Sequence, residues 1–158
     1  MFPKVLLSTI EDQCLPRNQL GQGATANVFK ITKDGVQYAF KKINPQHMND
    51  PSVQREIKLA ARLWHENIVR VHFLVLDDVS GDQQQSLNGG GVTSPPPCGM
   101  LLEVMQKGSL ATSIKQFQPV QILKFAEQIA LALSFAHSYR IVHRDVKPDN
   151  ILIDLKGE

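Results

Sequence analysis

The sequence predicts an α+β fold built from short strands and two main helices along 158 residues. Three observations lead to this prediction. Several short runs alternate in polarity or are rich in β-branched side chains, as strands are. Two longer segments repeat apolar residues every three and four positions, as amphipathic helices do. These segments follow one another as strand, strand, helix, strand, insertion, strand, helix, loop and short strand.

The first two predicted strands form a hairpin. They are expected over residues 27–32 and 36–43, because the Asp34-Gly35 pair between them is a strong signal for a tight hairpin turn. The remaining strands are expected over apolar runs at residues 69–76, 100–105 and 151–153. The chain therefore has enough strands for one sheet.

Two helices are predicted from apolar periodicity and from their start signals. The first is expected to begin at Pro51 with Asp50 as its cap, and the second to begin near Pro119. The apolar face of the first helix would consist of Ile57, Ala60, Ala61 and Leu63. The second helix would bury a stripe of Ile122, Phe125, Ala126, Ile129, Ala130, Leu133 and Ala136.

One segment departs from this globular pattern. Residues 77–98 are rich in Gly, Ser, Gln and Pro and contain almost no large apolar side chain. Such a composition cannot bury enough surface to offset the entropy lost on ordering, so we expect a flexible surface insertion. The whole chain is interpreted as one domain, with a first lobe over about 15–105 and the start of a second lobe over about 106–158.

Composition excludes several classes of function. The net charge is +2, which gives no electrostatic reason to expect nucleic acid or an anionic membrane as a partner. No apolar run approaches the roughly 20 residues that span a bilayer, so no membrane span is expected. The two cysteines, Cys14 and Cys98, have no metal-ligand spacing. We therefore expect an intracellular protein, in the cytoplasm.

A glycine motif lies where the first predicted strand begins. Residues 21–26, Gly-Gln-Gly-Ala-Thr-Ala, could be a simple hairpin turn, a dinucleotide-binding fingerprint or a phosphate-binding loop between antiparallel strands. The dinucleotide fingerprint requires a helix after the glycines. A β-branched strand and an Asp-Gly turn follow here instead, which favours the loop between antiparallel strands.

A lysine and a glutamate follow the glycine motif. Alternation along the second strand places Ala39 and Lys41 on one face and Phe40 and Lys42 on the other. The run Tyr38-Ala-Phe-Lys41 resembles the V-A-I-K strand of protein kinases. This resemblance implies that Ala39 leaves room for a flat ring, and that Lys41 reaches phosphates and pairs with Glu56 of the first helix. Lys42 would be the solvated neighbour. Taken singly, each charged residue would more commonly be an ordinary surface residue.

The segment from His143 to Asn150, His-Arg-Asp-Val-Lys-Pro-Asp-Asn, resembles the catalytic loop of protein kinases in every fixed position. Together with the glycine motif and Lys41, it makes the chain similar to a eukaryotic-type protein kinase from about Leu20 to Glu158. The resemblance implies a truncated kinase-like fold. An antiparallel sheet with one regulatory helix would form the first lobe, and the first helices and the catalytic loop would begin a helical second lobe.

The resemblance implies roles for the catalytic loop. Asp145 would orient the substrate hydroxyl and accept its proton, and Lys147 would lie near the transferred phosphate, as in the serine/threonine class. Asn150 would offer its side-chain carbonyl to Mg²⁺. His143 would be structural, and Arg144 resembles the arginine that grips an activation-loop phosphate in many kinases.

The resemblance also implies an ATP site. The backbone at Glu103 and Met105 would meet the adenine edge as the link between the lobes. The other residues carried over to the ATP site are Leu20, Gly21, Gln22, Gly23, Ala24, Thr25, Ala26, Asn27, Val28, Ala39, Lys41 and Glu56. The expected cofactors are ATP and Mg²⁺, and the expected macromolecular partner is a protein substrate with a serine or threonine.

Two departures from the family pattern limit this expectation. Ala26 replaces the third glycine of the loop, and the sequence contains no Asp-Phe-Gly, whose aspartate is the main magnesium ligand of kinases. Asp154 is followed by Leu-Lys-Gly and lies too close to Asn150 in the sequence to be that magnesium ligand. We therefore expect a fragment, a truncated product or an incomplete gene model that is inactive by itself. The alternatives are a non-catalytic fragment or pseudokinase that binds nucleotide or a partner, and an interaction module using the prolines at 95–97.

Overall fold

The computed structural model describes residues 2–78 and 95–157, and the chain divides into two compact units. The first unit comprises residues 1–61 and 71–102, and the second comprises residues 62–70 and 103–158. Each unit is described by itself below. Most of the predicted insertion at 77–98 lies outside the described residues.

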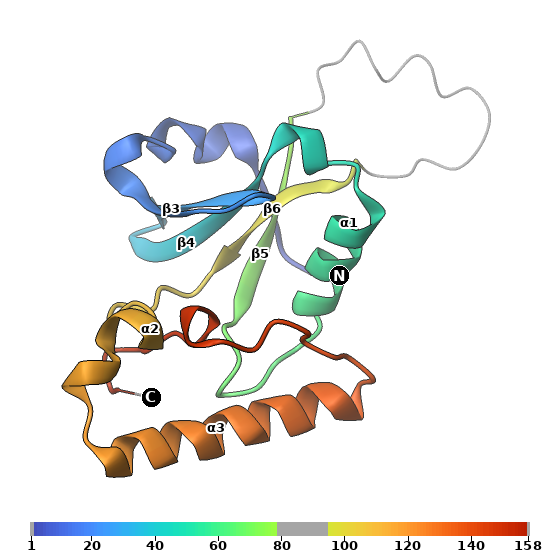
Figure 1. The fold of residues 1–158 in the computed structure, drawn as a ribbon. Coiled ribbons are helices and arrows are strands. Elements are labelled where there is room, and N and C mark those ends of the chain that lie inside the picture. Colours follow the sequence, from blue (N-terminus) through green and yellow to red (C-terminus); the bar gives the residue numbers. More distant parts are fainter. Residues whose placement is uncertain (1, 79–94, 158) are drawn as a thin grey trace. The chain divides into compact units, whose positions relative to one another are not determined.

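A six-stranded sheet forms the first unit, with strand order β1-β5-β6-β4-β3-β2 (Figure 1). Its strands are β1 (Lys4–Leu6), β2 (Gln19–Gln22), β3 (Ala26–Lys33), β4 (Val36–Ile43), β5 (Val71–Leu76) and β6 (Pro97–Leu102). Neighbouring strands are antiparallel, as predicted, except that β1 runs parallel to β5. Strand β6 begins three residues before the predicted start, and the buried Cys98 belongs to it rather than to the insertion.

The β3–β4 hairpin confirms the turn prediction. Asp34 and Gly35 have φ values of 51° and 77°, which is the left-handed geometry of a two-residue turn that suits the twist of the strands. The register continues for the full length of both strands, from Lys33 opposite Val36 to Ala26 opposite Ile43. The hairpin therefore fixes which side chains of β4 share a face.

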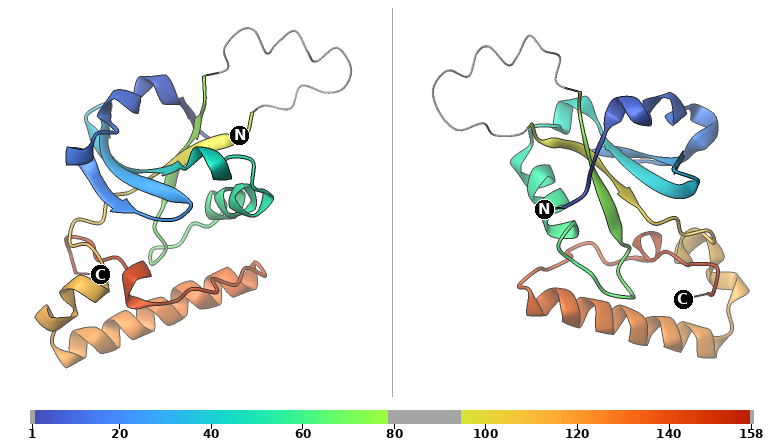
Figure 2. Two further views of the ribbon diagram at one scale, coloured as in Figure 1. Left: turned by 45° about the horizontal axis from the view of Figure 1, so that its top comes forward. Right: turned by 180° about the vertical axis from the view of Figure 1, so that it is seen from behind.

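Helix α1 (Pro51–Ala60) begins as the sequence predicts. The Asp50 carboxylate accepts a hydrogen bond of 2.8 Å from the backbone N–H of Ser52, and hydrogen bonding from Ser52 lowers the pKa of Asp50. The helix buries its apolar face against one face of the sheet (Figures 1 and 2). This cluster contains Ala26, Ile43, Val53, Ile57, Val71 and Met100, with Ala60 and Ala61 at its margin. The helix ends before Leu63, which lies in the second unit.

The opposite face of the sheet is covered by residues 4–18, which the sequence analysis did not assign to any element. They form β1 and three short 3-10 helices, η1 (Leu7–Thr9), η2 (Glu11–Gln13) and η3 (Pro16–Asn18). The cluster on this face contains Val5, Leu7, Ile10, Ile31, Phe40, Val75, Cys98 and Leu101. The sheet is therefore buried on both faces.

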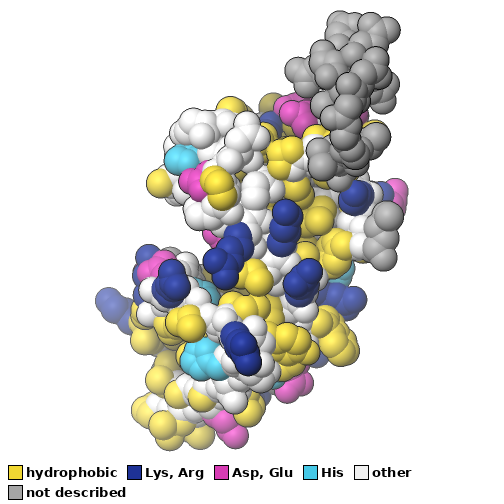
Figure 3. Space-filling model, turned by 90° about the vertical axis from the view of Figure 1, so that its right-hand side faces the viewer, with side chains coloured by type: hydrophobic (Ala, Val, Ile, Leu, Met, Phe, Trp, Pro, Cys, Tyr) yellow, Lys and Arg dark blue, Asp and Glu magenta, His cyan; other side chains and the backbone are white. Residues whose placement is uncertain are grey.

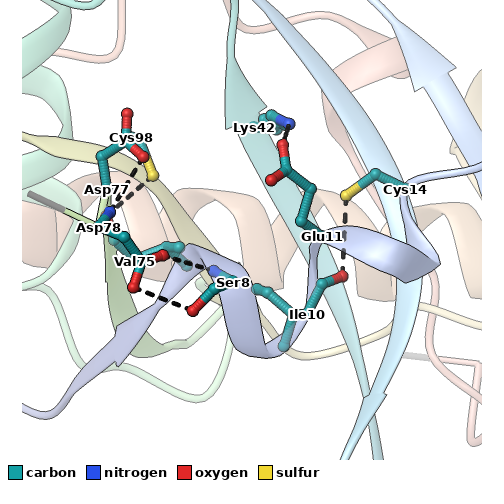
Figure 4. A network of polar contacts seen from close by, with 9 residues as sticks. All are labelled: Ser8, Ile10, Glu11, Cys14, Lys42, Val75, Asp77, Asp78 and Cys98. Carbon is teal, nitrogen blue, oxygen red and sulfur yellow. Dashed lines mark hydrogen bonds and ion pairs between the residues drawn. The ribbon is translucent and has the colours of Figure 1, made fainter. Parts of the chain in front are cut away.

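Polar contacts connect this N-terminal segment to the rest of the first unit, and those of Ser8 and Glu11 are drawn in Figure 4. The hydroxyl and the backbone N–H of Ser8 both donate to the Asp78 carboxylate, at 2.9 and 2.8 Å. The Gln13 side chain exchanges two hydrogen bonds with the backbone of Thr32. Side-chain contacts therefore tie Ser8 to the residues that follow β5, and Gln13 to β3.

The second unit contains α2 (Leu110–Ser113), η6 (Ile114–Gln116), α3 (Pro119–Ser138) and η7 (Pro148–Asn150). Helix α3 has the predicted bounds. Pro119 is its first residue, and Gln118 and Gln121 form a reciprocal capping box. Its N-terminal half packs on a small core of Leu110, Phe125 and Ile153, with Phe117, Ile122 and Ile151 beside them.

The apolar stripe predicted for α3 is only partly buried. Phe125 and Ala136 are buried, whereas Ala126 and Ala130 are exposed. Three further apolar side chains of the helix, Val120, Leu123 and Leu131, are 71%, 72% and 49% exposed. Exposed hydrophobic side chains among lysines and arginines are visible on the face of the molecule drawn in Figure 3.

The strand predicted at residues 151–153 is reduced to a single antiparallel bridge between Ser109 and Leu152. Backbone hydrogen bonds flank the bridge, one from Leu110 N–H to the Ile151 carbonyl at 2.7 Å and one from Ile153 N–H to the Gly108 carbonyl at 2.9 Å. These bonds fix the segment that directly follows the predicted catalytic loop.

Candidate functional site

The glycine motif forms the turn between β2 and β3 in the first unit. The Gly23 N–H donates to the Ala26 carbonyl at 2.9 Å, and Ala24 and Thr25 form the tip. Neither Gly21 nor Gly23 has a positive φ, so the turn does not need glycine for its backbone conformation. A Cβ added at Gly21 would meet nothing within 4 Å. The absence of a side chain therefore leaves open space at Gly21, whereas a Cβ added at Gly23 would lie 3.2 Å from the Ala26 carbonyl oxygen.

The Lys41 ammonium and the Glu56 carboxylate meet as predicted. Nζ of Lys41, on β4, lies 2.7 Å from Oε1 of Glu56, on α1. The two side chains are 28% and 57% exposed. A pair as exposed as this contributes at most about 1 kcal/mol to stability. The ion pair is therefore better explained by the orientation that Glu56 gives to the Lys41 ammonium than by its contribution to stability.

Other predicted ATP-site residues lie around this pair. Ala39 is buried on β4, two residues before Lys41, and Val28 stands opposite Lys41 on β3. Leu20 on β2 is exposed. Asn27, also on β3, is half-buried, and its Nδ2 donates to Asn44.

Lys42 is not the solvated neighbour that the sequence analysis expected. Its Nζ lies 2.7 Å from Oε1 of Glu11 in η2, and its side chain is half-buried like that of Lys41. The two lysines thus form ion pairs of equal length on opposite faces of the sheet, one with α1 and one with the N-terminal segment. Figure 4 shows the second of these pairs, between Lys42 and Glu11. The partner Glu11 could not be found from spacing, because it lies 31 residues before Lys42.

The predicted catalytic loop, in the second unit, is held together by its own side chains. Lys147 Nζ lies 3.0 Å from Oδ2 of Asp145, and Asn150 Nδ2 donates to the same oxygen at 2.8 Å. Asn150 Nδ2 also donates to the Asp145 carbonyl at 2.8 Å. These bonds, first that from Lys147 and then that from Asn150, lower the pKa of Asp145. Asp145 therefore stays ionised at neutral pH.

Backbone geometry also shapes this loop. The Asp145 N–H donates to Nδ1 of His143 at 3.3 Å, which gives His143 the structural role expected of it. Arg144 has a φ of 67°, in the left-handed region that non-glycine residues rarely adopt. Such strained residues cluster at functional sites, where the surrounding structure holds them.

The segment predicted to meet adenine follows β6. The Glu103 side chain accepts a hydrogen bond from the Arg70 N–H at 2.6 Å, and the Glu103 N–H donates to the Arg70 carbonyl at 3.0 Å. The Glu103 N–H is thus engaged within the protein. The Met105 carbonyl accepts a long bond of 3.4 Å from Gly108. A contact of either residue with adenine stays a prediction.

The described residues do not build a complete magnesium site. No group of three or more His, Cys, Asp or Glu side chains among residues 2–78 and 95–157 could hold a metal ion. Mg²⁺ prefers six oxygen ligands and usually takes one or two carboxylates. The predicted ligand Asn150 is neutral. Its Nδ2 donates to Asp145, so the atom that would bind the metal is its Oδ1.

Comparisons with known proteins establish the family of the chain. The family model of the protein kinase domain matches residues 16–158, so the chain belongs to the protein kinase family and holds part of a protein kinase domain. None of the helices in the described part of the chain combines the length and the apolar character needed to cross a membrane.

Similar proteins include several serine/threonine kinases. The chain is 31% identical over 147 residues to a probable serine/threonine-protein kinase of Dictyostelium discoideum, a match that covers 88% of this chain and 26% of that protein. It is 32% identical over 154 residues to the serine/threonine-protein kinase Nek1 of Mus musculus, covering 88% of this chain and 11% of that protein. It is also 32% identical over 148 residues to the interferon-induced, double-stranded RNA-activated protein kinase of Rattus norvegicus, covering 87% and 28%. The chain spans between 11% and 28% of the length of these relatives.

Proposed function

We propose that this chain supplies the ATP-binding and catalytic-loop residues of a protein serine/threonine kinase. The observation that carries the proposal is the arrangement around Asp145, whose Oδ2 is engaged by both Lys147 and Asn150. Lysine at this position and the names of the relatives support the serine/threonine class. The two free cysteines and the low net charge support an intracellular, cytoplasmic protein without a nucleic-acid partner.

The roles follow from the chemistry of phosphoryl transfer. The hydroxyl oxygen of the substrate attacks the γ-phosphorus of ATP, and the bond from that phosphorus to the bridging oxygen of ADP breaks. The ionised Asp145 orients the hydroxyl and takes its proton, using the carboxylate oxygen that Lys147 and Asn150 do not engage. Lys147 offsets negative charge on the phosphoryl group while it is being transferred.

ATP would be held by the first unit. The open space beside Gly21 and the backbone of the loop tip suit phosphate groups, and the Lys41 ammonium, oriented by Glu56, suits their charge. Since the described residues do not complete a magnesium site, these roles are those of the protein side chains alone.

A second candidate function is nucleotide binding without transfer. It is favoured by one observation: among residues 2–78 and 95–157, no group of three or more His, Cys, Asp or Glu side chains could hold a metal ion. Under this alternative the chain is a non-catalytic kinase fragment or a pseudokinase.

The experiment has two stages. Purified residues 1–158 should bind a fluorescent ATP analogue, and Lys41→Met should abolish this binding. The transcript should then be sequenced beyond the codon for Glu158, and the encoded polypeptide assayed with radiolabelled ATP and a basic protein substrate. Phosphoserine or phosphothreonine formed only with Asp145 intact supports the kinase. Binding without any transfer by the longer product supports the alternative.

A further inference from the structure

Asn44, the residue directly after β4, contacts every carbonyl at the tip of the glycine loop. Its side-chain Nδ2 lies 2.9 Å from the Ala24 carbonyl and 3.4 Å from the Gly23 carbonyl. Its backbone N–H donates to the Thr25 carbonyl at 2.9 Å. One residue therefore holds three consecutive carbonyls of the loop from the same side.

Asn44 is itself held in the orientation that this contact requires. Its Oδ1 accepts a hydrogen bond of 3.0 Å from Nδ2 of Asn27 on β3. An amide that accepts at its oxygen must present its N–H groups on the other side. The contact with Asn27 thus turns the Asn44 donors toward the loop.

Holding the carbonyls determines where the loop N–H groups point. In a planar trans peptide the C=O and the N–H point in opposite directions. The carbonyls of Gly23 and Ala24 share their peptide planes with the N–H groups of Ala24 and Thr25. Because those carbonyls face Asn44, the two N–H groups face away from it. Within the described part of the chain neither N–H donates a hydrogen bond.

We propose that Asn44 is a positioning residue for the phosphates of a bound nucleotide, acting by fixing the glycine loop so that the Ala24 and Thr25 N–H groups are presented together. The inference rests on the proposed function, since it assumes that ATP binds at this loop. Two adjacent N–H groups on one side of a turn form a small concave donor site that suits an anion. Fixing the loop beforehand reduces the ordering cost of binding.

The test separates phosphate binding from general damage to the fold. In residues 1–158, affinity would be measured for a fluorescent ATP analogue and, by competition, for adenosine, which lacks phosphates. Asn44→Ala should weaken ATP binding about tenfold, the loss expected from one or two hydrogen bonds, and should leave adenosine affinity unchanged. Asn44→Asp keeps the acceptor for Asn27 but loses the donors, so it should weaken ATP binding at least as much.

Asn18→Ala is the matched control. It removes one hydrogen bond, which the side-chain amide of Asn18 donates to the Gln13 carbonyl at the other end of β2. It should leave the affinity for ATP unchanged. Hydrogen exchange gives a readout independent of the Asn44 variants: in the wild type, ATP should slow exchange at the Ala24 and Thr25 amides.

The outcomes are distinguishable. Equal loss of ATP and adenosine affinity, unchanged ATP affinity in both Asn44 variants, or no protection of the two amides by ATP would each overturn the role of Asn44 while leaving ATP binding in place. Failure of the wild type to bind ATP, with Lys41→Met indistinguishable from it, would overturn the proposed function and this inference with it.

Discussion

In the first unit, Lys41 and Glu56 stand on a strand and a helix whose apolar faces are buried against each other, on a sheet that is covered on both sides. In the second unit, Asp145, Lys147 and Asn150 lie on an exposed loop and are held by bonds among themselves. The first arrangement depends on the core, whereas the second depends on a few polar side chains. Substitutions of buried residues in the first unit should therefore lower stability, whereas substitutions in the exposed loop of the second unit should change activity and leave stability unchanged.

The largest effect is expected at Asp145. In the polypeptide encoded by the full transcript, Asp145→Asn should lower phosphate transfer about 10²- to 10⁴-fold, because the amide cannot accept the substrate proton. Nucleotide affinity and the unfolding midpoint should stay unchanged, since the loop adds nothing to the core. Initial rates measure phosphate transfer, and denaturant melts measure the unfolding midpoint. Asp149→Asn, in the same loop, is the control, and robust transfer by Asp145→Asn would remove the assigned role.

A large loss of stability is expected on either face of the sheet. Ile10 in the N-terminal segment and Ile57 in α1 are 1% and 0% exposed. Truncation of either to alanine should cost about 2–5 kcal/mol of unfolding free energy. Urea melts of residues 1–158 provide the measurement, with the exposed Leu123→Ala as the control. If Ile10→Ala proved as mild as Leu123→Ala, the N-terminal segment would not be part of the core.

The apolar side chains of α3 should affect association rather than folding. Exchanging Val120 and Leu123 for lysine removes exposed hydrophobic surface, so the double variant should elute later and more sharply in size-exclusion chromatography. Its unfolding free energy should change by less than about 0.5 kcal/mol. An unchanged elution profile at high concentration would show that these side chains do not drive association.

The smallest effect on stability is expected at the two adjacent lysines. Lys41→Ala and Lys42→Ala each break one half-exposed ion pair, so each should cost no more than about 1 kcal/mol. ATP binding should distinguish them sharply: lost in Lys41→Ala and retained in Lys42→Ala. Equal effects on ATP affinity would contradict the assignment of Lys41 as the phosphate-binding lysine.

Local signals predicted much of the first unit and the start of α3 in the second. The Asp34-Gly35 turn, the Asp50 cap and the start of α3 at Pro119 all rest on short-range chemistry that the sequence displays directly. The pairing of Lys41 with Glu56 came from the family resemblance, because nothing local requires it.

The elements that were missed depend on contacts across long stretches of chain. Strand β1 is three residues long, which is too short to show a periodic pattern, and it pairs with a strand that begins at Val71. Local periodicity therefore could not predict it. Lys42 was assigned to solvent because its partner Glu11 lies far back in the sequence. Asn44 precedes a proline, and such a pair is typical of an ordinary turn. Its hydrogen bonds to the glycine loop depend on the register of β3 and β4, which the sequence does not display.

The burial of Cys98 gives the first unit an internal chemical reporter. Its thiol donates to the Val75 carbonyl at 3.4 Å, and desolvation by burial raises its pKa to about 12. A thiol must ionise to react with a disulfide reagent, so Cys98 is inert while the sheet is closed. Cys14, which is half-buried, provides the second thiol for comparison. The slower of two labelling phases in this chain should therefore record how often the cluster around Cys98, which includes Leu7 and Ile10 of the N-terminal segment, opens to solvent.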